Sequence, residues 1–215
     1  MNSIIIIGAG PGIGAAVARR FARENFSVAL VARKQETLQP IITELSEAGC
    51  DVIGELADAA NEEQLAHAIT RIEQKHGVPA ALVYNAAIVR RDKPGELGRE
   101  GLLASWETNV LGGMRAAVLL GEKMAAPTGG TILFTGGMPK PSPALTSLSL
   151  SKTALRALAE ILGHELGPKG VHVATVTVSG GPVASGGPYD PDEIAEHYWR
   201  LHQQKPADWQ HEVVH

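Results

Sequence analysis

The sequence has a single cysteine, few aromatic residues and no excess of positive charge. Cys50 is the only cysteine among 215 residues, so no internal disulfide can form, and we expect a reducing, cytoplasmic location. The eight histidines stand at spacings that match no recognised zinc site, so we expect no metal. The formal net charge of -4 supplies no basic field for a nucleic acid. We therefore expect a small-molecule partner and no nucleic acid.

Long apolar runs are also missing. The isoleucine run at 4–7 is far too short to span a membrane or to serve as a signal peptide, so we expect no membrane association and a buried strand at this place. Apolar residues make up 44% of the chain, which is enough for a core of ordinary size. The length then predicts a single domain over residues 1–215.

Short β-branched runs alternate along the chain with longer amphipathic stretches. This alternation predicts an α/β fold, a Rossmann-type doubly wound parallel sheet of six or seven strands with helices on both faces. Strands are expected at 4–7, 28–32, 52–56, 81–84, 131–134 and 171–178. Helices are expected at 13–24, 36–48, 61–76, 101–125 and 149–166, followed by a helix at 192–203 and an edge strand at 212–214.

A glycine-rich loop follows the first predicted strand and opens the first predicted helix. A pyrophosphate needs backbone amides that no Cβ shields and the positive end of a helix dipole behind them. The candidate residues for this contact are Gly8, Gly10, Gly12, Ile13 and Gly14. The alternative is a tight strand-to-helix turn without a ligand, but the strand–loop–helix placement favours a dinucleotide.

The choice of dinucleotide is predicted from charge. Chains that bind NAD usually carry an acidic residue at the end of the second strand, and Ala32 stands there in this sequence. Arg33 and Lys34 follow, and the planar fork of an arginine suits a 2′-phosphate. We therefore predict NADP in preference to NAD. The alternative is that Arg33 and Lys34 only form the solvated start of a helix.

Several motifs in the same order resemble the short-chain dehydrogenase/reductase family. The spacing Gly-x-x-x-Gly-Ile-Gly from Gly8 to Gly14 is the first of them. Asp58 stands where that family contacts the adenine. Asn85-Ala86-Ala87 resembles the end of the family's Asn-Asn-Ala-Gly stretch, with Tyr84 in place of the first Asn. The resemblance covers roughly residues 3 to 180, and it implies that Asp58, Asn85 and Ala86 contact the cofactor.

The resemblance also implies an oxidoreductase that transfers hydride between NADP(H) and a small carbonyl or alcohol. Asn109 matches the family's asparagine of the proton relay, and Lys152 matches the catalytic lysine that holds the nicotinamide ribose. The family's catalytic tyrosine stands four residues before that lysine, where this sequence has Leu148. Counted without gaps, the family's serine becomes Thr135, whose hydroxyl would polarise the substrate oxygen. The chain is therefore expected to be an atypical member that lacks the tyrosine.

Replacements for the missing phenol are few. Ser149 lies three residues before Lys152 and is a weak candidate for a relay, but serines at this place also cap and start helices. Tyr189 and Tyr198, in the tail, are candidates to fold over the site and supply a phenol. Without general acid–base help a reaction loses roughly 10²- to 10⁴-fold in rate, so slow turnover is still allowed.

Two further hypotheses stand beside the oxidoreductase. One is a catalytically weak or inactive NADP(H)-binding protein that acts as a sensor or an assembly subunit, which Leu148 favours. The other is a nucleotide-binding protein without nicotinamide, which is weaker because the glycine loop lacks the Lys-Ser/Thr ending of nucleoside-triphosphate sites. The apolar helices at 101–125 and 149–166 resemble those that pair across subunits in the family, so a homodimer or homotetramer is expected.

Overall fold

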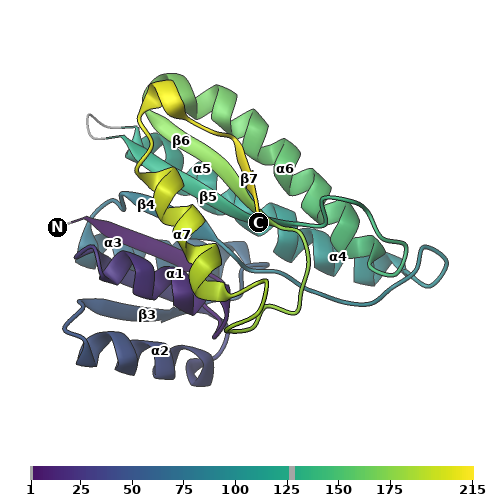
Figure 1. Cartoon of the computed structure of the whole chain (residues 1–215), viewed down its shortest axis with the longest axis horizontal. Helices are drawn as coiled ribbons and strands as arrows, with labels where there is room; N and C mark the ends of the chain where they lie inside the picture. Colours follow the sequence, from purple (N-terminus) through teal and green to yellow (C-terminus); the bar gives the residue numbers. More distant parts are fainter. Residues whose placement is uncertain (1, 126–128) are drawn as a thin grey trace.

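Seven parallel strands form one sheet through the middle of the molecule (Figure 1), in the order β3-β2-β1-β4-β5-β6-β7. The computed structural model describes residues 2–125 and 129–215. The strands are β1 (Ser3–Ile7), β2 (Ser27–Ala32), β3 (Val52–Leu56), β4 (Ala81–Tyr84), β5 (Gly130–Gly137), β6 (Val171–Val178) and β7 (Glu212–Val214). The predicted fold class is confirmed, and the short edge strand predicted at 212–214 is β7.

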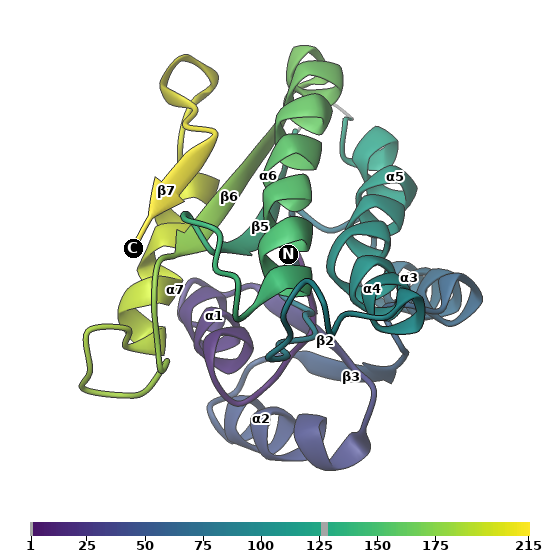
Figure 2. The same ribbon diagram turned by 90° about the vertical axis from the view of Figure 1, so that its right-hand side faces the viewer.

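Helices cover both faces of the sheet. One face carries α1 (Ile13–Ala22), α2 (Gln35–Glu47) and α7 (Pro191–His202), and the other carries α3 (Glu62–His76), α5 (Gly112–Met124) and α6 (Thr146–Leu166). Figure 2 shows α1 and α7 on one side and α3 and α5 on the other. Ile4 and Ile6 pack with the first set of helices and Ile5 and Ile7 with the second, because successive residues of a strand point to opposite faces. This two-sided burial explains the unbroken isoleucine run.

The helix predicted at 101–125 is interrupted. It consists of α4 (Arg99–Trp106), a π-helical turn η1 (Glu107–Leu111) and α5, and the N–H of Gly112 donates to the carbonyl of Glu107, five residues back. The Tyr84 hydroxyl donates to the carbonyl of Thr108 within this turn. A Cβ on Gly112 would lie 2.3 Å from that hydroxyl, so glycine gives the tyrosine its room. Turns of this kind gather at functional sites.

The C-terminal elements are tied to the sheet by their own capping and pairing. The Asp190 side chain accepts from the N–H of Asp192 at 2.8 Å, and Pro191 occupies the first helical position of α7. β7 pairs with β6 in parallel, with Glu212 beside Thr175. Within residues 2–125 and 129–215, none of the helices is long and apolar enough to span a bilayer.

A buried hydrogen bond joins α7 to β5. The hydroxyls of Thr135 and Tyr198 lie 2.7 Å apart, and Tyr198 is completely buried. Burial raises the pKa of the Tyr198 phenol above its usual range, although its bond to Thr135 acts in the opposite direction. Each hydroxyl therefore satisfies the other in a place that water does not reach.

This pair predicts the stability of three variants. We expect Thr135→Val and Tyr198→Phe each to lower the free energy of unfolding by about 1–3 kcal/mol, because each leaves one buried hydroxyl without its partner. The double variant should lose less than the sum, since no unpaired hydroxyl remains. Urea unfolding measures all three, with Tyr189→Phe, at a half-buried position, as the control. Additive losses in the double variant would contradict the pairing.

Candidate functional site

The carboxyl ends of β1 to β4 surround a pocket of about 270 Å³. It lies where the strand order reverses between β1 and β4, which is the place where open α/β sheets bind their ligands. The lining residues are 7–10, 31–34, 37, 57–59, 85–87 and 108. They include seven of the residues predicted to contact the cofactor: Gly8, Gly10, Arg33, Lys34, Asp58, Asn85 and Ala86.

The glycines of the first loop have different roles. Gly8 has a φ of +88°, and a Cβ on it would lie 2.3 Å from the backbone nitrogen of Ala86. A Cβ on Gly14 would lie 2.9 Å from the Cα of Ala9, so this glycine lets α1 pack against the loop. Gly10 has nothing within 4 Å of its Cβ position and faces the open pocket. Gly12 precedes α1, which Ile13 begins, so the unpaired amides of the helix start are at hand.

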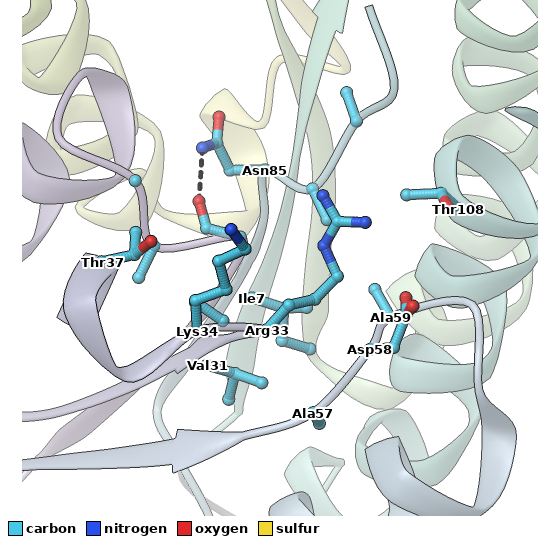
Figure 3. A pocket seen from close by; sticks show the side chains of 16 residues that line it. Ile7, Val31, Arg33, Lys34, Thr37, Ala57, Asp58, Ala59, Asn85 and Thr108 are labelled. Carbon is cyan, nitrogen blue, oxygen red and sulfur yellow. Dashed lines mark hydrogen bonds between the residues drawn. The ribbon is translucent and has the colours of Figure 1, made fainter.

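A side-chain amide holds the glycine loop against the loop that follows β4. Asn85 Nδ2 donates to the Gly8 carbonyl oxygen at 2.8 Å, which is the dashed contact in Figure 3. The same Gly8 has its N–H bonded to the carbonyl of Val31, at 2.9 Å. The loop is thus fixed from both neighbouring strands, and the pocket is formed before any ligand arrives.

Charge at the pocket is distributed unevenly. Figure 3 shows the side chains of Arg33 and Lys34 extending from the loop after β2 along the pocket. Lys34 Nζ lies 3.5 Å from a carboxylate oxygen of Glu36, whereas the exposed Arg33 has no carboxylate partner in residues 2–125 and 129–215. Asp58 is turned into its own loop, where its Oδ1 accepts from the N–H of Ala60 at 3.0 Å. The free cationic group of the pocket is therefore Arg33.

The π-turn and α6 hold the second group of predicted residues. Asn109 is fully buried in η1; its Oδ1 accepts from the N–H of Ile88 at 2.6 Å. Its Nδ2 donates to the Ile88 carbonyl at 3.2 Å and to Ser151 Oγ at 2.8 Å, which uses both amide hydrogens. Ser151 stands directly before Lys152, so this network fixes the start of α6 relative to the loop after β4. Asn109 is thus a structural link as well as a candidate for the site.

Lys152 lies 5% exposed beneath the end of β5. Its Nζ donates to the Thr135 carbonyl at 2.6 Å. Burial, and then the charge of Arg156 one turn further along α6, lower the pKa of its ammonium to about 8. Leu148, one turn earlier, is 7% exposed and has no polar atom to offer. A Cβ on Gly137 would lie 3.9 Å from Cγ and from Cε of Lys152.

The structure corrects two of the predicted catalytic candidates, Thr135 and Ser149. The Thr135 hydroxyl lies on the α7 side and is bonded to Tyr198, so it does not face a substrate beside Lys152. Since β5 continues to Gly137, the residue next to Lys152 at the strand end is Gly137. The relay role for Ser149 is wrong, because its Oγ accepts from the N–H of Ser142 at 2.9 Å and donates to the carbonyl of the same residue.

The tail tyrosines have separate outcomes. The prediction that Tyr198 covers the site is wrong, since its ring is buried with α1 and the sheet. Tyr189 lies at the end of β6, with its hydroxyl 3.5 Å from Ser179 Oγ and its ring over Gly180. Its role in the site stays a prediction.

Sequence reasoning missed the residues that anchor α6. Asp92, in the loop after β4, accepts from the N–H of Ser147 at 2.9 Å and from its hydroxyl, and so caps the helix. Burial alone would raise the pKa of this carboxyl, but the bonds from Ser147 and the charge of Arg90 lower it. Arg156 donates to the carbonyls of Gly137 at 2.7 Å and Met138 at 3.4 Å. The spacing of four residues from Lys152, one helical turn, could have identified Arg156 from the sequence. No local sequence motif identifies Asp92.

Comparison with known proteins assigns a family. The family model for short chain dehydrogenases matches residues 2–186. A short-chain dehydrogenase/reductase of Arabidopsis thaliana is 28% identical over 169 residues, which cover 76% of this chain and 65% of that protein. An oxidoreductase of Bacillus subtilis is 31% identical over 181 residues, covering 83% and 67%. The chain thus spans about two thirds of the length of these curated relatives.

Solved structures agree in fold. A short-chain dehydrogenase from Rhodopseudomonas palustris superposes with a TM-score of 0.89 at 27% identity, covering 100% of this chain and 97% of that one. A metagenomic short-chain oxidoreductase in complex with NADP superposes with a TM-score of 0.89 at 25% identity, covering 100% and 96%. The likeness extends over α7 and β7, which lie beyond the end of the family model's match.

The two pocket glycines give a matched test of the loop. Gly8→Ala should lower the free energy of unfolding by about 2 kcal/mol or more, because it combines a left-handed backbone with a clash against Ala86. Gly10→Ala should change it by less than about 1 kcal/mol, and it should weaken pyridine-nucleotide binding, because its methyl group enters the pocket. Thermal unfolding and equilibrium binding measure both; unfolding losses of equal size would contradict this assignment.

Proposed function

This chain belongs to the short-chain dehydrogenase family, and from that premise we propose that it transfers hydride between NADP(H) and a small carbonyl or alcohol. The observation that carries the proposal is the pocket at the β1/β4 switch point, where Asn85 holds the Gly8 loop and Arg33 has no carboxylate partner among the described residues. A preformed pocket of this shape, with amides on one side and a guanidinium on another, suits a dinucleotide with a 2′-phosphate.

The residues of the chain fit this cofactor at three points. Gly10 has an empty Cβ position facing the pocket, so a pyrophosphate can approach the backbone amides ahead of α1. Arg33 would contact the 2′-phosphate, with Lys34 beside it. Asp58 and Ala86 would border the adenosine, and Lys152 would hold the nicotinamide ribose as the family resemblance implies. The solved relative with bound NADP supports the same cofactor.

When bound, the nicotinamide supplies or accepts the hydride. What the chain itself contributes is positioning: the buried Asn109 fixes η1 and α6, and Asp92 fixes the first turn of α6. Proximity alone contributes a large part of the rate of a two-reactant step. The missing phenol removes roughly 10²- to 10⁴-fold, or about 3–5 kcal/mol of barrier, which leaves slow reduction within reach.

One observation favours a second candidate, an NADP(H)-binding protein with little turnover that serves as a sensor or an assembly subunit. Leu148 and Gly137, the two residues of α6 and β5 beside Lys152, carry no hydroxyl. Such a protein would need the pocket and would not need a proton donor. Turnover on a panel of aldehydes and ketones with NADPH separates the two, since ordinary rates exclude the sensor and no turnover with tight binding excludes the enzyme.

Assembly and location complete the proposal. We propose a homodimer or homotetramer that pairs through α5 and α6, because Val118 on α5 is 64% exposed and Ile161 on α6 is 63% exposed. Met114 on α5 and Leu150 on α6 are exposed as well. Light scattering tests this, and the mass of a single chain would contradict it.

We propose a reducing, cytoplasmic location from the single thiol of Cys50. Cell fractionation tests this, and recovery from an oxidising compartment would contradict it.

The cofactor preference depends on Arg33. Arg33→Gln should weaken NADPH binding about tenfold or more, because the charge-assisted contact with the 2′-phosphate is lost. NADH has no 2′-phosphate, so its binding should be nearly unchanged. Lys205→Gln, an exposed lysine after α7, removes the same charge elsewhere and is the control. Fluorescence titration with both reduced cofactors gives the ratio. Equal weakening of NADH and NADPH would show that Arg33 does not read the phosphate.

The missing phenol can be put back. Leu148→Tyr should raise turnover of a generic ketone at least about tenfold, because the introduced phenol places a proton donor one helical turn before Lys152. Gly137→Ser should add to this, since its Cβ position has only ordinary contacts, the nearest at 3.7 Å. Leu150→Tyr, half exposed on the same helix, is the control. Steady-state kinetics with NADPH measures all of them, and a Leu148→Tyr rate no better than that of Leu150→Tyr would contradict the assignment of this position.

A further inference from the structure

The loop 179–190, which joins β6 to α7, passes beside the glycine loop of the cofactor pocket. Its residue Val183 has Cγ1 3.9 Å from the position that a Cβ on Gly12 would take. Gly12 directly precedes α1, whose first amides have no partner within the helix and can receive a phosphate. A pyrophosphate bound at these amides would therefore have the 179–190 loop as its neighbour.

Few contacts hold this loop in place. Most of its residues are exposed, and its own backbone bonds include one from the N–H of Ala184 to the Tyr189 carbonyl at 3.2 Å. In the part of the chain that the structure describes, a single hydrogen bond joins residues 180–188 to a residue beyond the loop and α7. In this bond His215 Nε2 lies 3.0 Å from the Pro188 carbonyl oxygen.

His215 also binds the place where the loop leaves β6. Its N–H donates to the Thr177 carbonyl at 2.9 Å, and its main-chain oxygen accepts from the N–H of Ser179 at 2.9 Å and from the Ser179 hydroxyl at 2.6 Å. Figure 1 shows the loop leaving β6 beside the end marked C and returning to α7. The backbone of His215 is thus fixed at the start of the loop, and its ring reaches the far end at Pro188.

The hydrogen bonds of His215 determine where its ring carries a hydrogen. The Pro188 carbonyl can only accept, so His215 Nε2 is the donor. In the neutral ring Nδ1 then carries no hydrogen, and it lies 3.1 Å from Nε2 of His197 on α7. The hydrogen in this second bond therefore belongs to His197, which donates to His215.

The surroundings of His197 favour its neutral form. Burial, and then the charges of His215 and Arg200, lower the pKa of His197, while Glu196 acts in the opposite direction. Its ring therefore carries no charge at neutral pH. The two rings form an ordered relay from α7 through His215 to Pro188.

From these contacts we propose that His215 is a positioning residue for the cofactor: with its tautomer set by His197, it holds the 179–190 loop against Gly12, where the loop covers the bound pyrophosphate. The inference rests on the proposed function. A loop that is ordered beforehand costs less free energy to fix when the cofactor binds. The apolar side chain of Val183 would keep water from the bonds between amides and phosphate, which are stronger where water is excluded.

The first test needs no cofactor. Nitrogen-15 NMR of the histidine rings, above neutral pH, should show His197 and His215 both with their hydrogen on Nε2. It should also show a scalar coupling between His197 Nε2 and His215 Nδ1, with His197→Gln and His215→Phe used to assign the signals. A His215 ring that carries its hydrogen on Nδ1, or the absence of the coupling, would overturn the inference.

The second test compares two substitutions of the same histidine. His197→Gln keeps an N–H donor near the position of Nε2, whereas His197→Phe keeps the bulk of the ring and removes the donor. Elastase cleavage after Val183 or Ala184 reports how often the loop opens. We expect cleavage about tenfold faster in His197→Phe and in His215→Phe, and close to the wild-type rate in His197→Gln.

The control for cleavage is His164→Phe, at an exposed position of α6, which should leave the rate unchanged. If the histidines only filled space, His197→Phe would be tolerated and His197→Gln would not. That reversed order would overturn the relay.

The third test measures cofactor binding. His215→Phe should raise the Kd of NADPH about tenfold, because the loop no longer covers the pyrophosphate. On any carbonyl that the wild type reduces, kcat at saturating NADPH should change by less than about threefold, since the relay acts on binding. Faster cleavage of the loop with wild-type affinity for NADPH would overturn the role of His215 in cofactor binding.

The outcomes separate this inference from the proposed function. Failure of the wild type to bind NADPH overturns both. Tight binding by the wild type with equal affinity in His215→Phe overturns only the role of His215. If His215→Phe does not fold, the NADPH affinities of the two His197 variants decide: a loss in His197→Phe that is absent in His197→Gln supports the relay, and equal affinities overturn it.

Discussion

The left-handed backbone at Gly8 is the constraint on which the whole pocket depends. At this residue the chain leaves β1 and passes within contact distance of Ala86, and only a residue without a side chain can do so. Asn85 then bonds to the Gly8 carbonyl, so the loops after β1 and β4 become one rigid unit. Because the strand order of the sheet reverses between β1 and β4, the same contact that joins their loops also shapes the ligand pocket.

A second constraint is the set of hydrogen bonds that fixes α6 against the loop after β4. Asp92 caps α6, Asn109 bonds to Ile88 and Ser151, and Tyr84 supports the π-turn that carries Asn109. Together these bonds fix α6, and with it Lys152, relative to the loop after β4. These bonds order the surroundings of the buried Lys152 amine, whose neighbours on α6 and β5 include Leu148 and Gly137. An ordered frame of this kind is expected where geometry still matters for function.

Much of the fold could be predicted from the sequence because apolar residues are spaced differently along buried strands and along amphipathic helices. The isoleucines at 4–7 and the glycines after them predicted β1 and the loop correctly, since two-sided burial and close backbone approach both leave a local pattern. The end of β5 could not be predicted in the same way. Counting without gaps predicts Thr135 in the place of the family's serine, but β5 runs to Gly137, three residues beyond the strand predicted at 131–134, because Thr135, Gly136 and Gly137 continue the pairing with β6. The face on which Thr135 lies is decided by Tyr198, 63 residues away.

The most direct test of the central claim is a calorimetric titration of the wild-type protein with NADPH. The account predicts one site per chain and a positive shift of the unfolding temperature as the ligand concentration exceeds the dissociation constant, since the ligand binds only the folded pocket. Absence of binding and of any thermal shift at millimolar concentrations of both the reduced and the oxidised cofactor would contradict the account.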